Sequence, residues 1–344
     1  MKFNLSISSF LTLTLTLVAT LAPLHQFNSS FDTAIAGKKP TAQSAQPSSN
    51  MIPPNSKGND INRATEAMFR DGDYVRAKQY VDSARKTQPN EPLVYAMSTI
   101  YSFSAGNLEQ VKVLGEQTTQ AAKKLMATNP VRGNLYQGVG GAIGAAYEMK
   151  KNGPLGALNR LQQVFKYMDE AKRLSPNDPE LNLIKGYMDL LLAVNVPFAD
   201  TNQAIEQLQK SEPKYLAYRG IYIGYRDLKE YDKAMAAINT AIRLAPNNPE
   251  LKYYKAQILA IRGRESKAPA GDAELRESIK LFDVAYQRHD KLLTSTVIQV
   301  LSERCQAKNA LNRTDNSNCG SDEAKIRRDN PNVIVGPTKV PPLS

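Results

Sequence analysis

Residues 215–248 contain two helical patterns joined by a short polar turn. In the first half, Tyr218 and Tyr225 fall seven residues apart, on one face of a helix with 3.6 residues per turn. In the second half, Ala234 and Ala241 mark another face at the same spacing. Small side chains at such positions let two helix backbones approach closely. The stretch therefore predicts a helix–turn–helix unit, which limits the chain to folds built from paired helices.

The same pattern returns along the chain between residues 58 and 290. Residues 58–91 repeat the alanine positions, and the starts Pro179-Glu180-Leu181 and Pro249-Glu250-Leu251 are near copies of each other. We count about six such units, with polar insertions at 195–201 and 264–273 that break a strict period. No segment with strand periodicity is long enough to build a sheet. An all-α solenoid is therefore predicted.

The 34-residue stretch also resembles a known repeat family. It has an aromatic at its eleventh position (Tyr225), alanines at its twentieth and twenty-seventh positions, and Pro246 at its thirty-second. This combination resembles the tetratricopeptide repeat (TPR), and the chain as a whole resembles exported bacterial TPR proteins. The resemblance implies a right-handed superhelix of helix–turn–helix units. We expect a C-terminal capping helix at 291–313.

The two ends of the chain differ in composition from the predicted repeats at 58–290. Residues 1–36 have a basic start, an apolar run and the sequence Ala34-Ile35-Ala36, which together predict a signal peptide, either cleaved or kept as an anchor. Residues 37–57 and 314–344 are polar and rich in proline, so we predict a disordered linker and a disordered tail. We expect export to the periplasm or, in a photosynthetic cell, to the thylakoid lumen.

Export gives the two cysteines a compartment in which a disulfide persists. We predict a bond between Cys305 and Cys319. Two cysteines without nearby histidines cannot complete a tetrahedral metal site. His289 is the one histidine outside the predicted signal peptide, and no partner for acid–base chemistry can be identified in the sequence. We therefore predict no catalytic residue, no metal and no cofactor.

A glycine cluster at Gly138, Gly140, Gly141 and Gly144 invites comparison with a phosphate-binding loop. No strand precedes it, no Lys-Ser/Thr follows it, and its spacing differs from GxGxxG. We interpret these glycines as contacts between closely packed helices.

The TPR resemblance also implies where a partner binds. First-helix residues at about the second, fifth, ninth and twelfth positions of each repeat face a concave groove that holds a peptide. Arg219 and Arg226, seven residues apart, would hold a carboxylate there, or would pair with acidic residues of the chain itself. The predicted groove residues are Asn62, Glu66, Phe69, Ile100, Phe103, Tyr187, Leu190, Arg219, Ile223, Arg226, Tyr253 and Gln257.

These observations favour a non-enzymatic scaffold that binds a protein or peptide, with a role in envelope or lumenal assembly. Two alternatives stay open: a small-ligand or envelope-binding module or an enzyme that uses the inserted loops, and a spacer held at a membrane surface by its basic ends. The net charge is +11, of which +6 lies on residues 37–63 and 304–344, at the two ends of the array. We therefore expect no nucleic-acid partner and at most a weak attraction to an anionic membrane.

Overall fold

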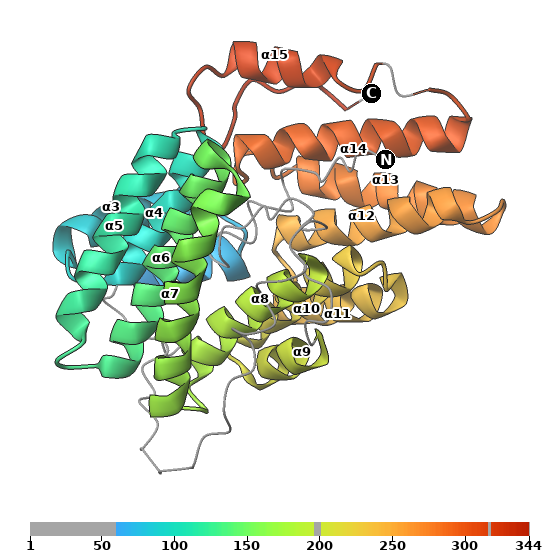
Figure 1. The fold of residues 1–344 in the computed structure, drawn as a ribbon. Helices are drawn as coiled ribbons and strands as arrows, with labels where there is room; N and C mark the ends of the chain where they lie inside the picture. Colours follow the sequence, from blue (N-terminus) through green and yellow to red (C-terminus); the bar gives the residue numbers. More distant parts are fainter. Residues whose placement is uncertain (1–59, 196–200, 316–317, 344) are drawn as a thin grey trace. The chain divides into compact units, whose positions relative to one another are not determined.

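The computed structural model describes residues 60–195, 201–315 and 318–343, and these form an all-α fold (Figure 1). Consecutive helices pack in neighbouring pairs, as a helical solenoid requires. The described chain has no named strand, only an isolated bridge between Leu293 and Val335. The predicted signal peptide (1–36) and linker (37–57) lie outside the described residues.

The described residues divide into two compact units, whereas the sequence predicts one continuous array from 58 to 290. Unit 1 contains residues 83–195 and 201–212. Unit 2 combines residues 60–82 with residues 213–315 and 318–343. The boundary at residue 82 falls inside helix α3 (Tyr74–Thr87).

Unit 1 is a series of antiparallel helices, seen in green in Figure 1. Several begin with proline, which is tolerated in the first turn because its missing N–H would have no partner there. Asn129 caps one of these helices by accepting a hydrogen bond from the backbone N–H of Arg132. The helices are α4 (Pro92–Ser104), α5 (Leu108–Leu125), α6 (Pro130–Asn152), α7 (Pro154–Leu174), α8 (Pro179–Asn195) and α9 (Thr201–Lys210).

A half-buried ion cluster joins the starts of three helices in unit 1. The Arg132 guanidinium donates to both carboxylate oxygens of Glu180, at 2.8 and 3.2 Å, and to those of Glu91, at 3.0 and 3.1 Å. The Tyr136 hydroxyl donates to Glu180 at 2.6 Å. Such forked contacts fix direction as well as distance. The cluster therefore sets the position of α6 against the starts of α4 and α8.

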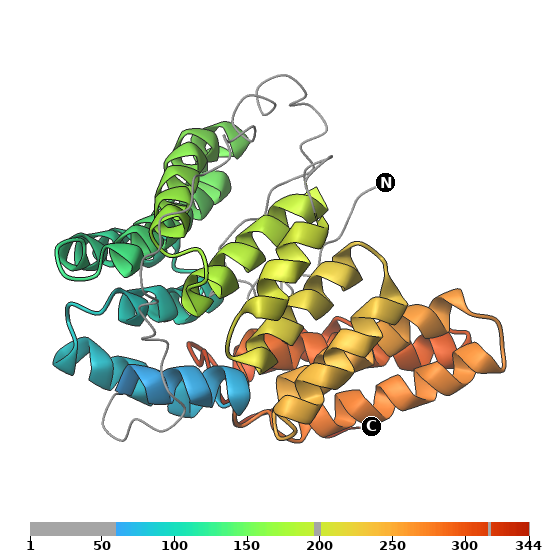
Figure 2. The same cartoon turned by 90° about the horizontal axis from the view of Figure 1, so that it is seen from below.

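Unit 2 contains the remaining helices, and the antiparallel pair at residues 249–286 is clear in orange in Figure 2. Small residues allow the close approach within its pairs: Ala234, Ala241 and Ala285 have no exposed surface. Its elements are α2 (Asp60–Thr65), the π-helical η1 (Glu66–Arg70), the first part of α3, α10 (Lys214–Asp227), α11 (Tyr231–Leu244), α12 (Pro249–Glu265), α13 (Ala270–Tyr286), α14 (Thr294–Asn312) and α15 (Ser321–Asp329).

Residues 60–82 pack against elements that follow them by more than 130 positions. The Asn248 amide donates to the backbone carbonyl of Phe69 at 2.9 Å. The backbone N–H of Tyr74 donates to the carbonyl of Lys291 at 2.8 Å. In a linear array each repeat contacts only its neighbours. Unit 2 departs from that rule because the first helices of the chain belong to its core.

A second ion cluster, more deeply buried than the first, anchors these N-terminal helices. Arg219 donates to Glu250 at 3.1 Å and to the Tyr254 hydroxyl at 3.2 Å. The Tyr74 hydroxyl donates to the other oxygen of Glu250 at 2.9 Å. The Arg219 guanidinium also lies over the ring of Phe69, 5.9 Å from its centroid. Tyr74 and Phe69 thereby tie residues 60–82 to α10 and α12.

The C-terminal tail, predicted to be disordered over 314–344, contains α15 and a packed strap. Cys305 and Cys319 form a disulfide, S–S 2.00 Å, which holds the start of the tail beside α14. Ile326 is completely buried, and the Asn330 side chain donates to the carbonyls of Ile326 and Lys339. The polar composition suggested too little apolar surface for order. The disulfide and these local hydrogen bonds stabilise the tail, and the composition of the tail does not reveal them.

The two insertions have different outcomes. Residues 196–200 of the first lie outside the described residues. The second, predicted as a polar loop at 264–273, is mostly helical, because α12 runs to Glu265 and α13 begins at Ala270. The expected capping helix at 291–313 corresponds to α14, and α15 packs against it.

Candidate functional site

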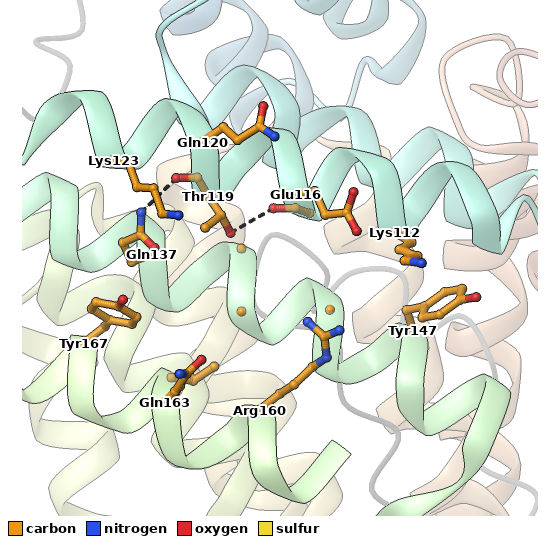
Figure 3. Close-up of a pocket in the computed structure, with 15 residues that line it drawn as sticks. Lys112, Glu116, Thr119, Gln120, Lys123, Gln137, Tyr147, Arg160, Gln163 and Tyr167 are labelled. Atoms are coloured by element: carbon orange, nitrogen blue, oxygen red, sulfur yellow. Dashed lines mark hydrogen bonds between the residues drawn. The ribbon is translucent and has the colours of Figure 1, made fainter. Parts of the chain in front are cut away.

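Unit 1 carries a groove of about 440 Å³ between α5, α6 and α7 (Figure 3). Side chains of α5 and α7 form its two walls, and α6 forms its floor. We call it the α5–α7 groove. The residues that define it here are Lys112 and Lys123 of α5, Gly140 and Gly144 of α6, and Arg160 and Tyr167 of α7.

The floor is low because α6 presents glycines where α5 and α7 approach it. A Cβ added at Gly140 would lie 2.3 Å from the Thr119 hydroxyl, and one at Gly138 would lie 2.6 Å from Met168. These distances are too short for any side chain, so the helices pack backbone to side chain. The glycine cluster therefore serves close helix packing, as predicted. The space above Gly141 and Gly144 is taken by side chains of α7: a Cβ added there would lie 3.0 Å from Val164 and 2.8 Å from the Arg160 guanidinium.

One end of the groove carries two cations and a tyrosine (Figure 3). The Lys112 ammonium lies over the Tyr147 ring, 5.7 Å from its centroid. The Tyr147 hydroxyl donates to Glu109 at 3.0 Å, and this hydrogen bond raises the pKa of the phenol. Opposite, Arg160 is exposed and reaches Glu148 at 3.4 Å. Lys112 and Arg160 are the cations of this end, and Glu109 and Glu148 lie beside them.

The other end is formed by Lys123, Gln137 and Tyr167 (Figure 3). Lys123 is exposed, whereas Gln137 is buried and donates to the backbone carbonyl of Thr119 at 2.8 Å. That bond fixes α6 against α5 at this end. The result is one long groove with a positive charge at each extremity and amide side chains between them.

The predicted concave groove does not form an open surface within either unit. Ile100 is buried in α4 and Phe103 is half-buried beside it; Tyr187 and Leu190 are buried in α8. In unit 2, Glu66 is half-buried and pairs with Arg70 at 3.3 Å. The predicted residues that unit 2 brings together in its interior are Asn62, Phe69, Arg219, Ile223, Arg226, Tyr253 and Gln257.

The two arginines expected to hold a partner's carboxylate have acidic partners within the chain. Arg219 is 1% exposed and pairs with Glu250, which is 0% exposed. Arg226 pairs with its neighbour Asp227 at 2.7 Å and lies near the Gln257 side chain. Both arginines are therefore committed to intramolecular contacts, the second of the two readings that the sequence left open.

A polar cluster on α12 and α14 extends this interior. The Gln257 amide donates to both carboxylate oxygens of Glu303, at 3.0 and 2.9 Å, and the Tyr253 hydroxyl donates to Glu303 at 3.0 Å. Burial raises the pKa of Glu303, while these two donors and the nearby arginines act in the opposite direction. The side chains of this cluster therefore hydrogen-bond to one another within unit 2.

Two features of the molecule escaped the sequence reading. The acidic residues of the two near-copied helix starts, Glu180 and Glu250, are buried ion-pair partners rather than solvated caps. The α5–α7 groove was also missed, although Lys112, Lys123 and the glycine cluster are all visible in the sequence. The repeated Pro-Glu-Leu sequence was the signal that could have revealed the two ion clusters. The groove could be found only by knowing how α5, α6 and α7 pack together.

The described part of the chain, residues 60–195, 201–315 and 318–343, has neither a metal site nor a membrane span. No group of three or more His, Cys, Asp or Glu side chains there is arranged to hold a metal ion. His289 Nδ1 lies 2.9 Å from the Pro337 carbonyl oxygen, so this ring binds the C-terminal strap. None of the helices formed by these residues has the length and hydropathy needed to span a bilayer.

No protein-family model matches the chain, and no curated protein is significantly similar to it.

Proposed function

We propose that this chain is an exported, non-catalytic scaffold that binds a segment of a partner protein in the α5–α7 groove. The observation that carries the proposal is the groove itself: about 440 Å³, with the exposed polar side chains of Gln120, Lys123 and Gln163 on its walls and α6 as its floor. Helical repeat folds commonly present such surfaces to peptides. The TPR-like pattern of residues 215–248 supports the same class of function.

Export is part of the proposal and has two independent supports. The N-terminal 36 residues have the composition of a signal peptide. The Cys305–Cys319 disulfide belongs to an oxidising compartment. The periplasm or a thylakoid lumen provides such conditions. Assembly work in that compartment suits a scaffold without catalytic residues.

The test blocks the groove without touching its charges. Gln163 is an exposed residue of α7 that lines the groove, and its neighbour Gln162 is exposed but does not line it. A random peptide library is selected on the wild-type protein, and the enriched peptides are measured on Gln163→Trp and Gln162→Trp by fluorescence anisotropy. We expect affinity to fall about tenfold or more for Gln163→Trp, because the indole fills the groove, and to stay unchanged for Gln162→Trp.

Equal binding to both tryptophan variants would show that the peptides bind elsewhere. A library from which no peptide is enriched would reject the proposed function. Circular dichroism melts of the two variants provide the folding control, since both positions are on the surface of the same helix.

A further inference from the structure

We infer that the segment bound in the α5–α7 groove is extended and acidic, with two carboxylates about five residues apart. This inference rests on the proposed function and specifies the chemistry of its ligand. The charges at the two ends of the groove, the distance between them and the polar groups along its length point to this ligand.

The charge of the lining is positive. Lys112, Lys123 and Arg160 contribute +3 and Glu116 contributes −1, so the sum is +2. Arg160 is exposed, and its contact with Glu148 at 3.4 Å is of the weak, solvent-screened kind. It can therefore exchange that partner for a carboxylate of the ligand. The complementary ligand carries at least two negative charges.

The distance between the charges determines the spacing in the ligand. Lys112 and Lys123 lie on the same helix, 11 residues apart, which corresponds to about 16 Å at 1.5 Å per residue. An extended peptide rises by about 3.3 Å per residue, so about five residues cover that length. Arg160 lies at the Lys112 end, opposite Tyr147 (Figure 3). One acidic residue would meet Lys112 and Arg160, and the other would meet Lys123.

Between the ends, the groove offers groups that suit a peptide backbone. Gln120 and Gln163 are exposed on the two walls, and each side-chain amide can both donate and accept. An extended segment has backbone N–H and C=O groups without partners of its own. At Gly144 the flexible Arg160 guanidinium covers the floor, and its movement to a ligand carboxylate would let that backbone approach α6.

A nucleic acid fits the same groove poorly. A nucleic-acid strand has a phosphate at every nucleotide and would place one beside Glu116, about one helical turn from Lys112, whereas a peptide can place a neutral residue there. Lys112 already lies over the ring of Tyr147, and the Tyr147 hydroxyl is bonded to Glu109, so that ring is not free to stack on a base. A protein segment is the ligand class that these groups favour.

The test uses defined peptides and the full-length protein with its disulfide intact. Three fluorescein-labelled ten-residue peptides have the same neutral background. One carries aspartates five positions apart, one carries them two positions apart, and one carries asparagines five positions apart. We expect the first to bind about tenfold more tightly than either of the others, and added salt to weaken it selectively.

Charge reversal then places the ligand in the groove. Lys112→Glu with Lys123→Glu should reduce binding of the five-spaced aspartate peptide about a hundredfold, and should create binding for a peptide with lysines at the same two positions. The matched control is Lys150→Glu with Lys166→Glu, which makes the same change in net charge on exposed residues of α6 and α7 that do not line the groove. This control should retain wild-type affinity.

The outcomes separate this inference from the proposed function. Peptides that bind with no preference for aspartate, yet are blocked by Gln163→Trp, would overturn the acidic ligand and leave the peptide groove standing. Competition by a single-stranded oligonucleotide, lost in the charge-reversed variant, would replace the peptide with a nucleic acid. Failure of every peptide, together with a library that yields none, would reject both.

Discussion

Two buried ion clusters use the same residue types to hold helices together, one in each compact unit. In unit 1, Arg132 bridges two carboxylates, Glu91 and Glu180, and its side chain is 15% exposed. In unit 2, Arg219 pairs with one carboxylate, Glu250, and their side chains are 2% and 0% exposed. A tyrosine hydroxyl also donates to one carboxylate in each cluster, Tyr136 to Glu180 and Tyr74 to Glu250.

The difference lies in charge balance and solvation. The unit 1 cluster has one cation and two anions, which remains tolerable because water reaches it. Among the described residues, the unit 2 cluster pairs Arg219 with Glu250, so these charges balance where water has little access. The same Pro-Glu helix start therefore belongs to a partly solvated ion cluster in unit 1 and to a fully buried one in unit 2. The buried cluster should tolerate the loss of a charged partner less well. This predicts that equivalent substitutions have unequal effects.

The largest effect is expected from Arg219→Met. It leaves the Glu250 carboxylate buried without its cation, which should cost about 3–5 kcal/mol of unfolding free energy. Hydrogen exchange followed by mass spectrometry should show faster exchange in α10, α12 and residues 60–82, and no change in α4 to α8. Adding Glu250→Gln removes the unpaired charge and should restore about half of the loss. Uniform exchange across both units would refute the local origin of the effect.

A smaller loss, about 2 kcal/mol, should follow Arg132→Met in unit 1. Here Glu91 and Glu180 lose their shared cation and repel each other, but water and proton uptake moderate the cost. The same exchange experiment should place the change in α4, α6 and α8. A loss equal to that of Arg219→Met would mean that burial does not distinguish the two clusters.

Glu91→Gln tests the surplus carboxylate of unit 1. Arg132 keeps Glu180, so the unfolding free energy should fall by only about 1 kcal/mol or less in urea titrations. Glu180→Gln removes the carboxylate that also accepts from Tyr136, and it serves as the comparison that should cost more. If the two changes cost the same, the surplus-charge description of this cluster is wrong.

The smallest change, and one of opposite sign, is expected for Glu303→Gln. Burial raises the pKa of Glu303, so the folded state favours its protonated form. Its contribution to stability is therefore fully present below the unfolded-state pKa, near 4.5, and declines as pH rises through the higher folded-state pKa. The glutamine keeps an acceptor for Gln257 and Tyr253 without a charge. Its melting temperature should exceed that of the wild type above pH 7 and converge with it near pH 4.

The sequence predicted the helix pairs well because the spacing of apolar residues that forms them involves only nearby positions. The seven-residue spacing of Tyr218 and Tyr225, and of Ala234 and Ala241, is enough to predict a helix pair. The structure has α10 and α11 there. The packing role of Gly140 likewise follows from its neighbours in the chain, and the structure confirms it, because an added Cβ there would clash with the Thr119 hydroxyl and the Gly115 carbonyl.

Features that depend on distant pairing could not be predicted. The bond from Tyr74 to Glu250 spans 176 positions, and no periodicity encodes which carboxylate an arginine meets. Residues of the concave-groove prediction, such as Arg219 and Tyr253, were placed by their repeat position. Their burial depends on residues 60–82 and on α14. The ordered tail also depended on a pairing, that of Cys305 with Cys319.

The discontinuous composition of unit 2 affects how the chain is made. Residues 60–82 leave the ribosome before the rest of unit 2, yet Tyr74 meets Glu250 only after 176 further residues have been added. At about 5–20 residues per second, that interval lasts about 9–35 s. During it, Met68 and Phe69, which are buried in the finished protein, have no core to enter. Unit 2 is therefore completed late in biosynthesis, and its first helices remain open to chaperones or to a translocation channel until the last third of the chain arrives.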